Sequence, residues 1–308
     1  MMKQCSAVLV RLLAATLIFA LGLPALAEID LNRNESLPKQ CWNILLLGGD
    51  SPNASSYGRT DSMVILSINE TEERVKMTSI LRDTWVQMAG HQAYNKINAS
   101  NVFDGPEGAV ETVNHAFGTD IQEYILINIP EMVEIVDLFG GVDVEITQGE
   151  RNVINEEVEK YDRKYDKQYL KEAGLVHLDG LQAMFYSRIR RLDSDYLRAE
   201  RQQKVLLALA ENMQNMDVDE LMGKVSQLEE RIKTNLTPEQ LKTLSNIGLI
   251  VDIDTVQQFR VPVDGTFTSS TVDGTWRINP DLEKNQQLLH DFIYLDQPPE
   301  SAAEATAE

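Results

Sequence analysis

A dense group of basic residues is the first part of the sequence that could do chemistry. Six arginines and lysines lie between residues 188 and 204, where an even spread of 28 basic residues over 308 would place between one and two. They are Arg188, Arg190, Arg191, Arg198, Arg201 and Lys204. Arginine binds phosphate oxygens through paired hydrogen bonds, and the N-terminus of a helix also attracts anions. The segment therefore predicts a site for a phosphate-bearing anion.

Two elements would present these side chains to a shared anion. A strand is predicted at 185–189, and if the chain is extended there, the i, i+2 spacing of Arg188 and Arg190 would point both to the same face. Asp195 has the position of an N-cap, and apolar residues at helical spacing follow it. The first two turns of that helix would carry Arg198, Arg201 and Gln202. Cations at a helix N-terminus oppose its dipole by about 0.3–1 kcal/mol each, unless an anion joins them.

A second group of polar residues lies where predicted strands begin and end. The strands are predicted at 43–47, 63–68 and 74–79, the last two forming a hairpin. Asp50 closes the first strand, Arg59 and Asp61 open the second, and Arg82 follows the third. Sheets of α/β proteins place their sites at strand ends. Paired carboxylates such as Asp50 and Asp61 suit Mg²⁺, which shares its other positions with water and substrate phosphates.

Both groups also have a purely structural interpretation. The arginines can pair with Asp193, Asp195 and Glu200 on a solvated helix face. Taken alone, Asp50 fits an Asx-turn. Gly48-Gly49 is no Walker loop, because no Gly-Lys-Ser/Thr follows it. The two groups gain weight only when they are considered together.

Nine short motifs connect these groups in a fixed order. They are Asn43–Asp50, Gly58–Ser62, Ser79–Thr84, Lys96–Ala99, Gly105–Glu107, Gly140–Val142, Leu178–Ala183, Tyr186–Arg190 and Asp195–Gln203. In this order they resemble the LytR–CpsA–Psr family of cell-envelope glycopolymer transferases, over about residues 42–215. One departure is Leu81, where the family usually has proline before Arg-Asp. This departure removes no functional group.

The resemblance implies a fold and a set of site residues. The fold would be a three-layer α/β/α sandwich with a central mixed sheet, enclosing an apolar tunnel for a polyprenyl chain. By resemblance, Mg²⁺ would be held by Asp50 and Asp61. The pyrophosphate would be bound by Arg59, Arg82, Arg188, Arg190 and Arg198, with Gln202 and Asp195 ordering the cluster. Phosphoryl transfer needs charge neutralisation and positioning more than a covalent nucleophile, so this equipment is sufficient.

The resemblance also implies an activity and its partners. Such proteins move an anionic glycopolymer from a polyprenyl-pyrophosphate carrier to a hydroxyl of the cell wall, usually on peptidoglycan. Teichoic acid, capsule and other polymers all remain open as the cargo. A first alternative is a non-catalytic protein that binds or senses polyprenyl phosphates. A second is a transcriptional regulator, which the missing helix-turn-helix signal disfavours.

The acidic composition limits the partners further. The chain has 28 basic and 48 acidic residues, a net charge of −20, and 43% hydrophobic residues. A sequence-independent nucleic-acid binder needs a basic face, so we expect no nucleic-acid partner. The hydrophobic content supports a well-buried core.

The N-terminus has the layout of an export signal. Lys3 and Arg11 precede the apolar run 12–27, which ends in the small-x-small sequence Ala25-Leu26-Ala27. We expect residues 1–27 to be a signal peptide or a retained membrane anchor, although 16 apolar residues fall short of the roughly 20 that span a bilayer. In both cases the body would be exported to the cell envelope, at the membrane surface or in the wall.

The rest of the chain divides by composition. Residues 28–41 are expected to be a linker, 42–296 one catalytic domain and 297–308 a disordered tail. Further strands are predicted at 124–129 and 142–146, and helices at 130–139, at 237–249 and from Asn279-Pro280 onward. The charged segment 150–171 is either helical or a mobile flap.

Overall fold

The computed structural model describes most of the chain between residues 34 and 295. The described residues are 34, 36–38, 41–51, 57–69, 71–72, 74–161, 168–192, 195–214, 216, 220, 224, 227, 232–237, 239–240, 243–244 and 255–295. The expected signal segment, 1–27, and the expected tail, 297–308, lie outside them. Within the described part, no helix has both the length and the apolar composition to cross a bilayer.

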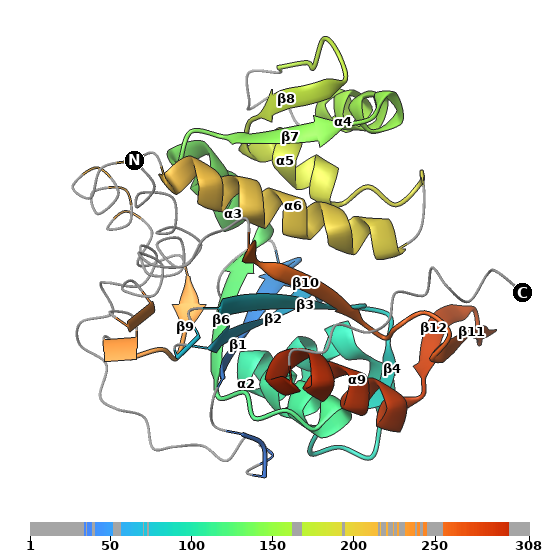
Figure 1. The fold of residues 1–308 in the computed structure, drawn as a ribbon. Coiled ribbons are helices and arrows are strands. Elements are labelled where there is room, and N and C mark those ends of the chain that lie inside the picture. Colours follow the sequence, from blue (N-terminus) through green and yellow to red (C-terminus); the bar gives the residue numbers. More distant parts are fainter. Residues whose placement is uncertain are drawn as a thin grey trace, which may run out of the picture. The chain divides into compact units, whose positions relative to one another are not determined.

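Contacts group the chain into two compact units. We call Ile127–Ile232 with Thr237–Asp254 the helical unit, and Leu23–Leu126, Lys233–Leu236 and Thr255–Glu308 the sheet unit. Figure 1 shows the elements of both units along the chain.

A six-stranded sheet organises the sheet unit. Its order is β10-β3-β2-β1-β6-β9. The strands are β1 (Trp42–Gly49), β2 (Thr60–Asn69), β3 (Arg74–Ile80), β6 (Glu123–Asn128), β9 (Lys233–Thr234) and β10 (Gln257–Val261). β1, β2 and β3 are antiparallel neighbours, whereas β10 runs parallel to β3. The predicted α/β class with a central mixed sheet is confirmed, as are the three N-terminal strands and the strand at 124–129.

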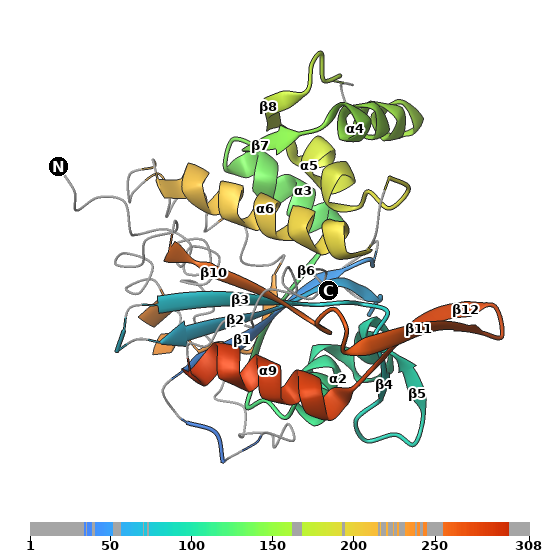
Figure 2. The same ribbon diagram turned by 45° about the vertical axis from the view of Figure 1, so that its right-hand side comes forward.

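Two helices cover one face of this sheet. α2 (Ser100–Phe117) and α9 (Leu282–Leu295) lie side by side beneath it (Figures 1 and 2). Their apolar side chains enter one buried cluster with those of the strands, including Leu45, Ile65, Val113, Phe117, Leu289 and Phe292. Burying each such side chain contributes roughly 1.5–3 kcal/mol, so this cluster fixes the strands whose ends carry the predicted site.

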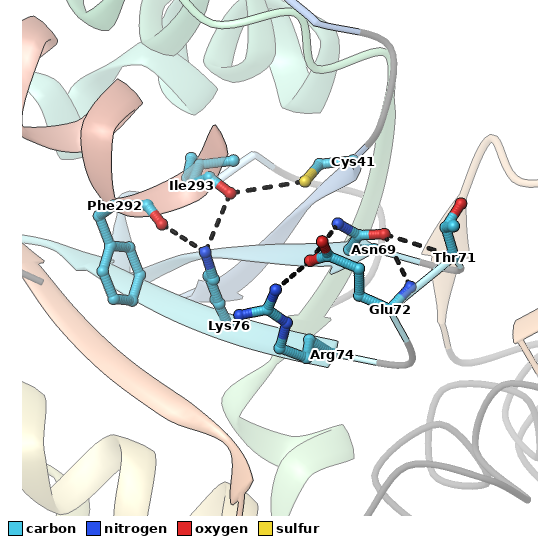
Figure 3. A network of polar contacts seen from close by, with 8 residues as sticks. All are labelled: Cys41, Asn69, Thr71, Glu72, Arg74, Lys76, Phe292 and Ile293. Atoms are coloured by element: carbon cyan, nitrogen blue, oxygen red, sulfur yellow. Dashed lines mark hydrogen bonds and ion pairs between the residues drawn. The ribbon is translucent and has the colours of Figure 1, made fainter. Parts of the chain in front are cut away.

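A buried lysine fastens the C-terminal helix to the sheet. Lys76 of β3 is 4% exposed, and its Nζ donates to the carbonyls of Phe292 (2.5 Å) and Ile293 (3.1 Å), as Figure 3 shows. Cys41 Sγ donates to the same Ile293 carbonyl at 3.5 Å. Burial lowers the pKa of Lys76. The last carbonyls of a helix lack partners within the helix, so this contact satisfies them.

Smaller elements complete the sheet unit. They are β4 (Trp85–Gln87), β5 (Tyr94–Lys96), the 3₁₀ turn η1 (Ile97–Ala99), β11 (Phe267–Val272) and β12 (Thr275–Pro280). The hairpin of β11 and β12 extends away from the sheet in Figure 2. η1 leads directly into α2, so residues 97–99 lie at the start of that helix.

Where it is described between residues 127 and 214, the helical unit contains helices and a two-stranded sheet. These are α3 (Ile129–Leu138), β7 (Val142–Ile146), α4 (Gln148–Lys160), β8 (Gly174–Leu178), α5 (Gly180–Ser187) and α6 (Asp195–Gln214). The predicted helix at 130–139 and strand at 142–146 are confirmed. α3 and α5 approach closely, because a Cβ at Gly180 would stand 2.1 Å from the carbonyl oxygen of Val133.

Two predicted elements were wrong. Residues 185–189 form no strand: Phe185 to Ser187 end α5, and Arg188 caps it. A capping box decides this, since Asp179 accepts from Gln182 N and Gln182 reaches back to Asp179 N. Asn279 and Pro280 do not open the last helix, because both belong to β12. That helix follows Asp281, whose Oδ1 accepts from Lys284 N at 3.1 Å.

Two other predicted segments are described only in part. The charged stretch after residue 147 is helical through Lys160, and a capping box of Thr147 and Glu150 begins it. Residues 162–167 lie outside the described part. At Thr237, the predicted capping contacts with Gln240 are present in both directions, whereas most of the helix predicted up to 249 is not described.

Candidate functional site

The predicted strand-end residues of the sheet unit share one edge of the sheet. Antiparallel pairing brings the end of β1, the start of β2 and the end of β3 together. Past an irregularity at Gly48 and Gly49, Asp50 N donates to Arg59 O at 2.8 Å. The register of the strands therefore places Asp50, Arg59, Asp61 and Arg82 at this edge, as the sequence predicted.

Asp61 lies at the centre of a polar network. Its Oδ2 accepts from Arg82 Nη1 at 2.7 Å, and its Oδ1 accepts from Asn98 Nδ2 at 3.0 Å. The other end of the Asn98 amide accepts from Arg59 Nη1 at 3.2 Å. Arg59 is thus linked through one asparagine to the ion pair of Arg82 and Asp61. We call Arg59, Asp61, Arg82 and Asn98 the edge network.

A buried acid holds Arg82 from its other side. Asp83 is 5% exposed, and its Oδ2 lies 3.4 Å from Arg82 Nε. Its Oδ1 pairs with Lys96 Nζ at 2.7 Å. The side chain of Arg82 is 12% exposed. Asp61 therefore orients the guanidinium by a hydrogen bond, Asp83 adds an electrostatic contact, and Lys96 belongs to the same cluster of charges.

Asp50 is held over a glycine. A Cβ at Gly58 would stand 2.3 Å from Asp50 Oδ1 and 2.7 Å from the backbone nitrogen of Ser51. The carbonyl of Gly58 accepts from Asn101 Nδ2 at 2.7 Å, which anchors the turn to α2. Only glycine therefore fits at residue 58. Asp50 is an exposed residue, and its carboxylate lies against this glycine.

The donor set of this edge is compatible with Mg²⁺. Among the described residues, no group of three or more His, Cys, Asp or Glu side chains could enclose a metal. Asp61 keeps acceptor capacity, because each carboxylate oxygen has two lone pairs and the side chain is 21% exposed. Mg²⁺ typically takes one or two carboxylates and completes its shell with water and phosphates. Asp50 and Asp61 therefore suit Mg²⁺ if water and a phosphate substrate supply its further oxygens.

The helical unit carries the remaining predicted residues. Arg188 and Arg190 are exposed on either side of the buried Ile189, although no strand presents them. Arg198 is 3% exposed, an unusual degree of burial for arginine. Asp195 is the first residue of α6, and Gln202 lies one turn after Arg198 on the same helix.

Two arginines of the basic segment have structural partners. Arg201 is 4% exposed and pairs through Nε with Glu150 Oε1 at 2.6 Å. Its Nη1 also donates to the carbonyl of Ile189 at 3.1 Å. Arg191 pairs with Glu156 at 2.6 Å on the surface of α4. The structural interpretation thus holds for these two, but with acids of α4 as partners.

Sequence reasoning overlooked two residues of these clusters. Asn98 was visible only as part of the motif Lys96–Ala99, because an asparagine beside a strand end has no chemical signature by itself. Glu150 was visible as the last residue of a Thr-x-x-Glu capping box. Its second role, as partner of Arg201, joins residues 51 positions apart and leaves no local pattern.

The family model of the LytR_cpsA_psr family matches residues 26–292. The chain belongs to this family. It is 29% identical over 256 residues to the polyisoprenyl-teichoic acid–peptidoglycan teichoic acid transferase TagU of Bacillus cereus, covering 81% of this chain and 75% of TagU.

Solved structures of family members share the fold. The crystal structure of Bacillus subtilis TagV superposes with a TM-score of 0.65 at 26% identity, covering 85% of this chain and 100% of TagV. A LytR-CPS2A-psr family protein, YwtF (TagT), was solved with bound octaprenyl pyrophosphate lipid. It superposes with a TM-score of 0.65 at 22% identity, over 89% of this chain and 99% of that one.

Proposed function

We propose that this protein transfers an anionic glycopolymer from a polyprenyl-pyrophosphate carrier to a hydroxyl of peptidoglycan. Teichoic acid is the cargo named for the relatives, and it is the first candidate here. The edge network supports the proposal best, because it joins two arginines, the side chains suited to a diphosphate, to a carboxylate that suits a cation.

Charge neutralisation is the main chemical task of this reaction. The acceptor hydroxyl attacks the phosphorus that bears the polymer, the bond to the bridging oxygen breaks, and the hydroxyl proton passes to the leaving phosphate or to water. Polyprenyl monophosphate leaves with the bridging oxygen and its electron pair. Arg82, held by Asp61 and Asp83, and Arg59, held by Asn98, would bind the phosphate oxygens. Arginines fixed in advance stabilise developing charge without the cost of reorienting during the reaction.

The arginines of the helical unit are part of the proposal. Arg188, Arg190 and Arg198 are assigned to the same diphosphate on the basis of their motif, with Asp195 and Gln202 ordering them. Their exposure differs, since Arg188 and Arg190 are exposed whereas Arg198 is buried. We therefore assign the first contact with the anion to the exposed pair, and keep Arg198 as a binding residue by its motif.

Asp50 and Asp61 are the residues that would hold Mg²⁺. When bound, the ion would neutralise part of the charge on the diphosphate. Asp61 is prepared for this role because Arg82 and Asn98 fix both of its oxygens.

The proposed substrates place the protein in the cell envelope. A polyprenyl carrier is embedded in the membrane, and peptidoglycan lies outside it. Activity at this boundary agrees with the export signal that the sequence predicts for residues 1–27.

Transfer to an acceptor tests the proposal. The purified full-length protein is incubated with a polyprenyl-pyrophosphate-linked saccharide phosphate and uncrosslinked peptidoglycan. We expect equal amounts of polyprenyl monophosphate and of a new phosphodiester on the peptidoglycan, detected by mass spectrometry. Tight binding of the lipid without either product would instead indicate a non-catalytic lipid-binding protein and would refute the proposal.

A further inference from the structure

Asn98 has the contacts of a residue that orients the site rather than one that merely fills space. It lies in η1 between β5 and α2 and is 3% exposed. Both ends of its side-chain amide are engaged by charged groups of the edge network: Oδ1 by Arg59 and Nδ2 by Asp61. Its backbone nitrogen also donates to the carbonyl of Arg82 at 3.2 Å.

The amide is suited to this position because it is neutral and has one acceptor and two donors at a fixed distance. Arg59 and Asp61 are two residues apart on the chain and carry opposite charges. Asp61 is already paired with Arg82, so the amide adds a neutral link from this ion pair to Arg59. With the amide bonded to both, the guanidinium of Arg59 and the carboxylate of Asp61 are each oriented by the same neutral group.

The backbone around Asn98 is itself fixed. Ile97 is fully buried, and its nitrogen donates to the carbonyl of Thr84 at 2.7 Å. Ser100 Oγ donates to the carbonyl of Ile97 at 2.7 Å. The amide therefore projects from a rigid turn. Because its own position is fixed, it can determine the orientation of the side chains that bond to it.

We propose that Asn98 is a positioning residue of the phosphate site, whose amide bridge holds Arg59 and Asp61 in their binding orientation. The proposal rests on the proposed function, since it takes the edge network to be the diphosphate site. Asn98 would not touch the reacting atoms. Its effect would be transmitted by Arg59 and Asp61.

The chain offers a matched control in the same helix region. Asn114 of α2 is 1% exposed and also forms an amide bridge, donating to Ile121 O (2.8 Å) and accepting from Thr119 Oγ1 (2.7 Å). Replacing either asparagine with leucine keeps its approximate volume and removes its hydrogen bonds. Both variants should lower the melting temperature, but only Asn98→Leu should affect the site.

Calorimetric binding of inorganic pyrophosphate to the full-length protein is the test. We expect Asn98→Leu to weaken binding about tenfold and Asn114→Leu by less than about twofold. In an Arg59→Ala background, Arg82 still provides a binding site for pyrophosphate. There, the loss of affinity caused by Asn98→Leu should be clearly smaller than in the parent protein. Unchanged affinity in Asn98→Leu, equal losses in the two leucine variants, or the same loss in both backgrounds would overturn the proposal.

The outcomes separate this proposal from the proposed function. Coupling between Asn98 and Arg59 without any polymer transfer would refute the transferase activity and leave the positioning role intact. If the parent protein transfers polymer but the effects of Asn98→Leu and Arg59→Ala on pyrophosphate affinity are additive, the positioning role alone would be refuted. Failure of the parent to bind pyrophosphate would refute both.

Discussion

Single residues at the sheet edge are packed so tightly that one added carbon should disturb the site. Gly58 is the clearest case, because the space where a Cβ would stand is occupied by the Asp50 carboxylate and the backbone of Ser51. Backbone cannot move away as a flexible side chain can. The absence of a side chain at residue 58 therefore leaves the space that the carboxylate of Asp50, a proposed metal ligand, occupies.

Gly58→Ala should reduce activity more than stability. We expect kcat/KM for the lipid-linked substrate to fall by about 10- to 100-fold, because displacing Asp50 by about 1 Å is sufficient to disrupt a positioned group. Gly90→Ala is the control, since nothing lies within 4 Å of a Cβ there. Its positive φ of 70° makes it the more strained substitution, yet it should leave kcat/KM unchanged. Equal activity losses in the two variants would contradict this explanation.

The residues of the site were predictable where strand order alone brings them together. Asp50, Arg59, Asp61 and Arg82 follow or precede consecutive strands, so local patterns place them at one edge. Asn98 was not predictable, because its two partners are 39 and 37 residues away and its type is common in turns.

At the scale of elements, a buried ion pair connects two helices of the helical unit. Arg201 of α6 and Glu150 of α4 form this pair with 4% and 11% of their side chains exposed. Arg191 and Glu156 form a second pair with α4, at 44% and 49% exposure. The two pairs join α4 to neighbouring residues of the basic segment, and they differ mainly in burial.

Truncating the two arginines should therefore have unequal effects. We expect Arg201→Ala to lower the free energy of unfolding by about 3–5 kcal/mol, because it leaves the Glu150 carboxylate buried without its cation. Arg191→Ala should cost no more than about 1 kcal/mol, as is usual for exposed pairs. Urea denaturation of both variants measures the difference. Similar values for the two would show that burial does not determine the strength of these contacts.

The same pair predicts a dependence of stability on pH. Burial opposes the shift, but hydrogen bonds from Thr147 and Arg201 lower the pKa of Glu150 below its ordinary value of 4.5. Stabilisation from a lowered pKa is fully present above the unfolded-state value and is lost as pH falls through the folded-state value. The stability advantage of the parent over Glu150→Gln should therefore be largest near neutral pH and shrink below about pH 4.5. Denaturant unfolding from pH 7 to 3.5 checks this, and a constant difference would contradict it.

Elements were predictable where periodicity or caps were unambiguous. The strands from 43 to 79 and the helix at 130–139 had such signals. The segment 185–189 did not, since so short a segment fits a strand or the end of a helix equally well. There the capping box of Asp179 and Gln182 was the better guide, and it was present in the sequence.

At the scale of the whole molecule, the net charge of −20 opposes an anionic polymer. The arginines act locally, whereas the acidic surface repels the rest of the substrate over the Debye length, about 10 Å at 0.1 M salt. A long anionic polymer meets more of this repulsion than a short one on the same carrier.

Salt should therefore favour long donors relative to short ones. We expect the ratio of kcat/KM for a donor of many anionic repeats to that for a donor of two repeats to rise between about 20 mM and 200 mM salt. Taking the ratio cancels the contribution of the shared pyrophosphate. A ratio that falls with salt would mean that the polymer follows a basic path on the protein.

The most direct test of the account is turnover of a polyprenyl-pyrophosphate-linked saccharide by the full-length protein, with and without Mg²⁺. The variants are Asp61→Ala and Arg82→Ala, with Arg74→Ala, from an exposed pair with Glu72, as the control. We predict turnover that requires Mg²⁺, persists in Arg74→Ala, and falls by about 100-fold or more in the two edge-network variants. Turnover that is independent of Mg²⁺, or retained when folded Asp61→Ala and Arg82→Ala proteins are assayed, would contradict the account.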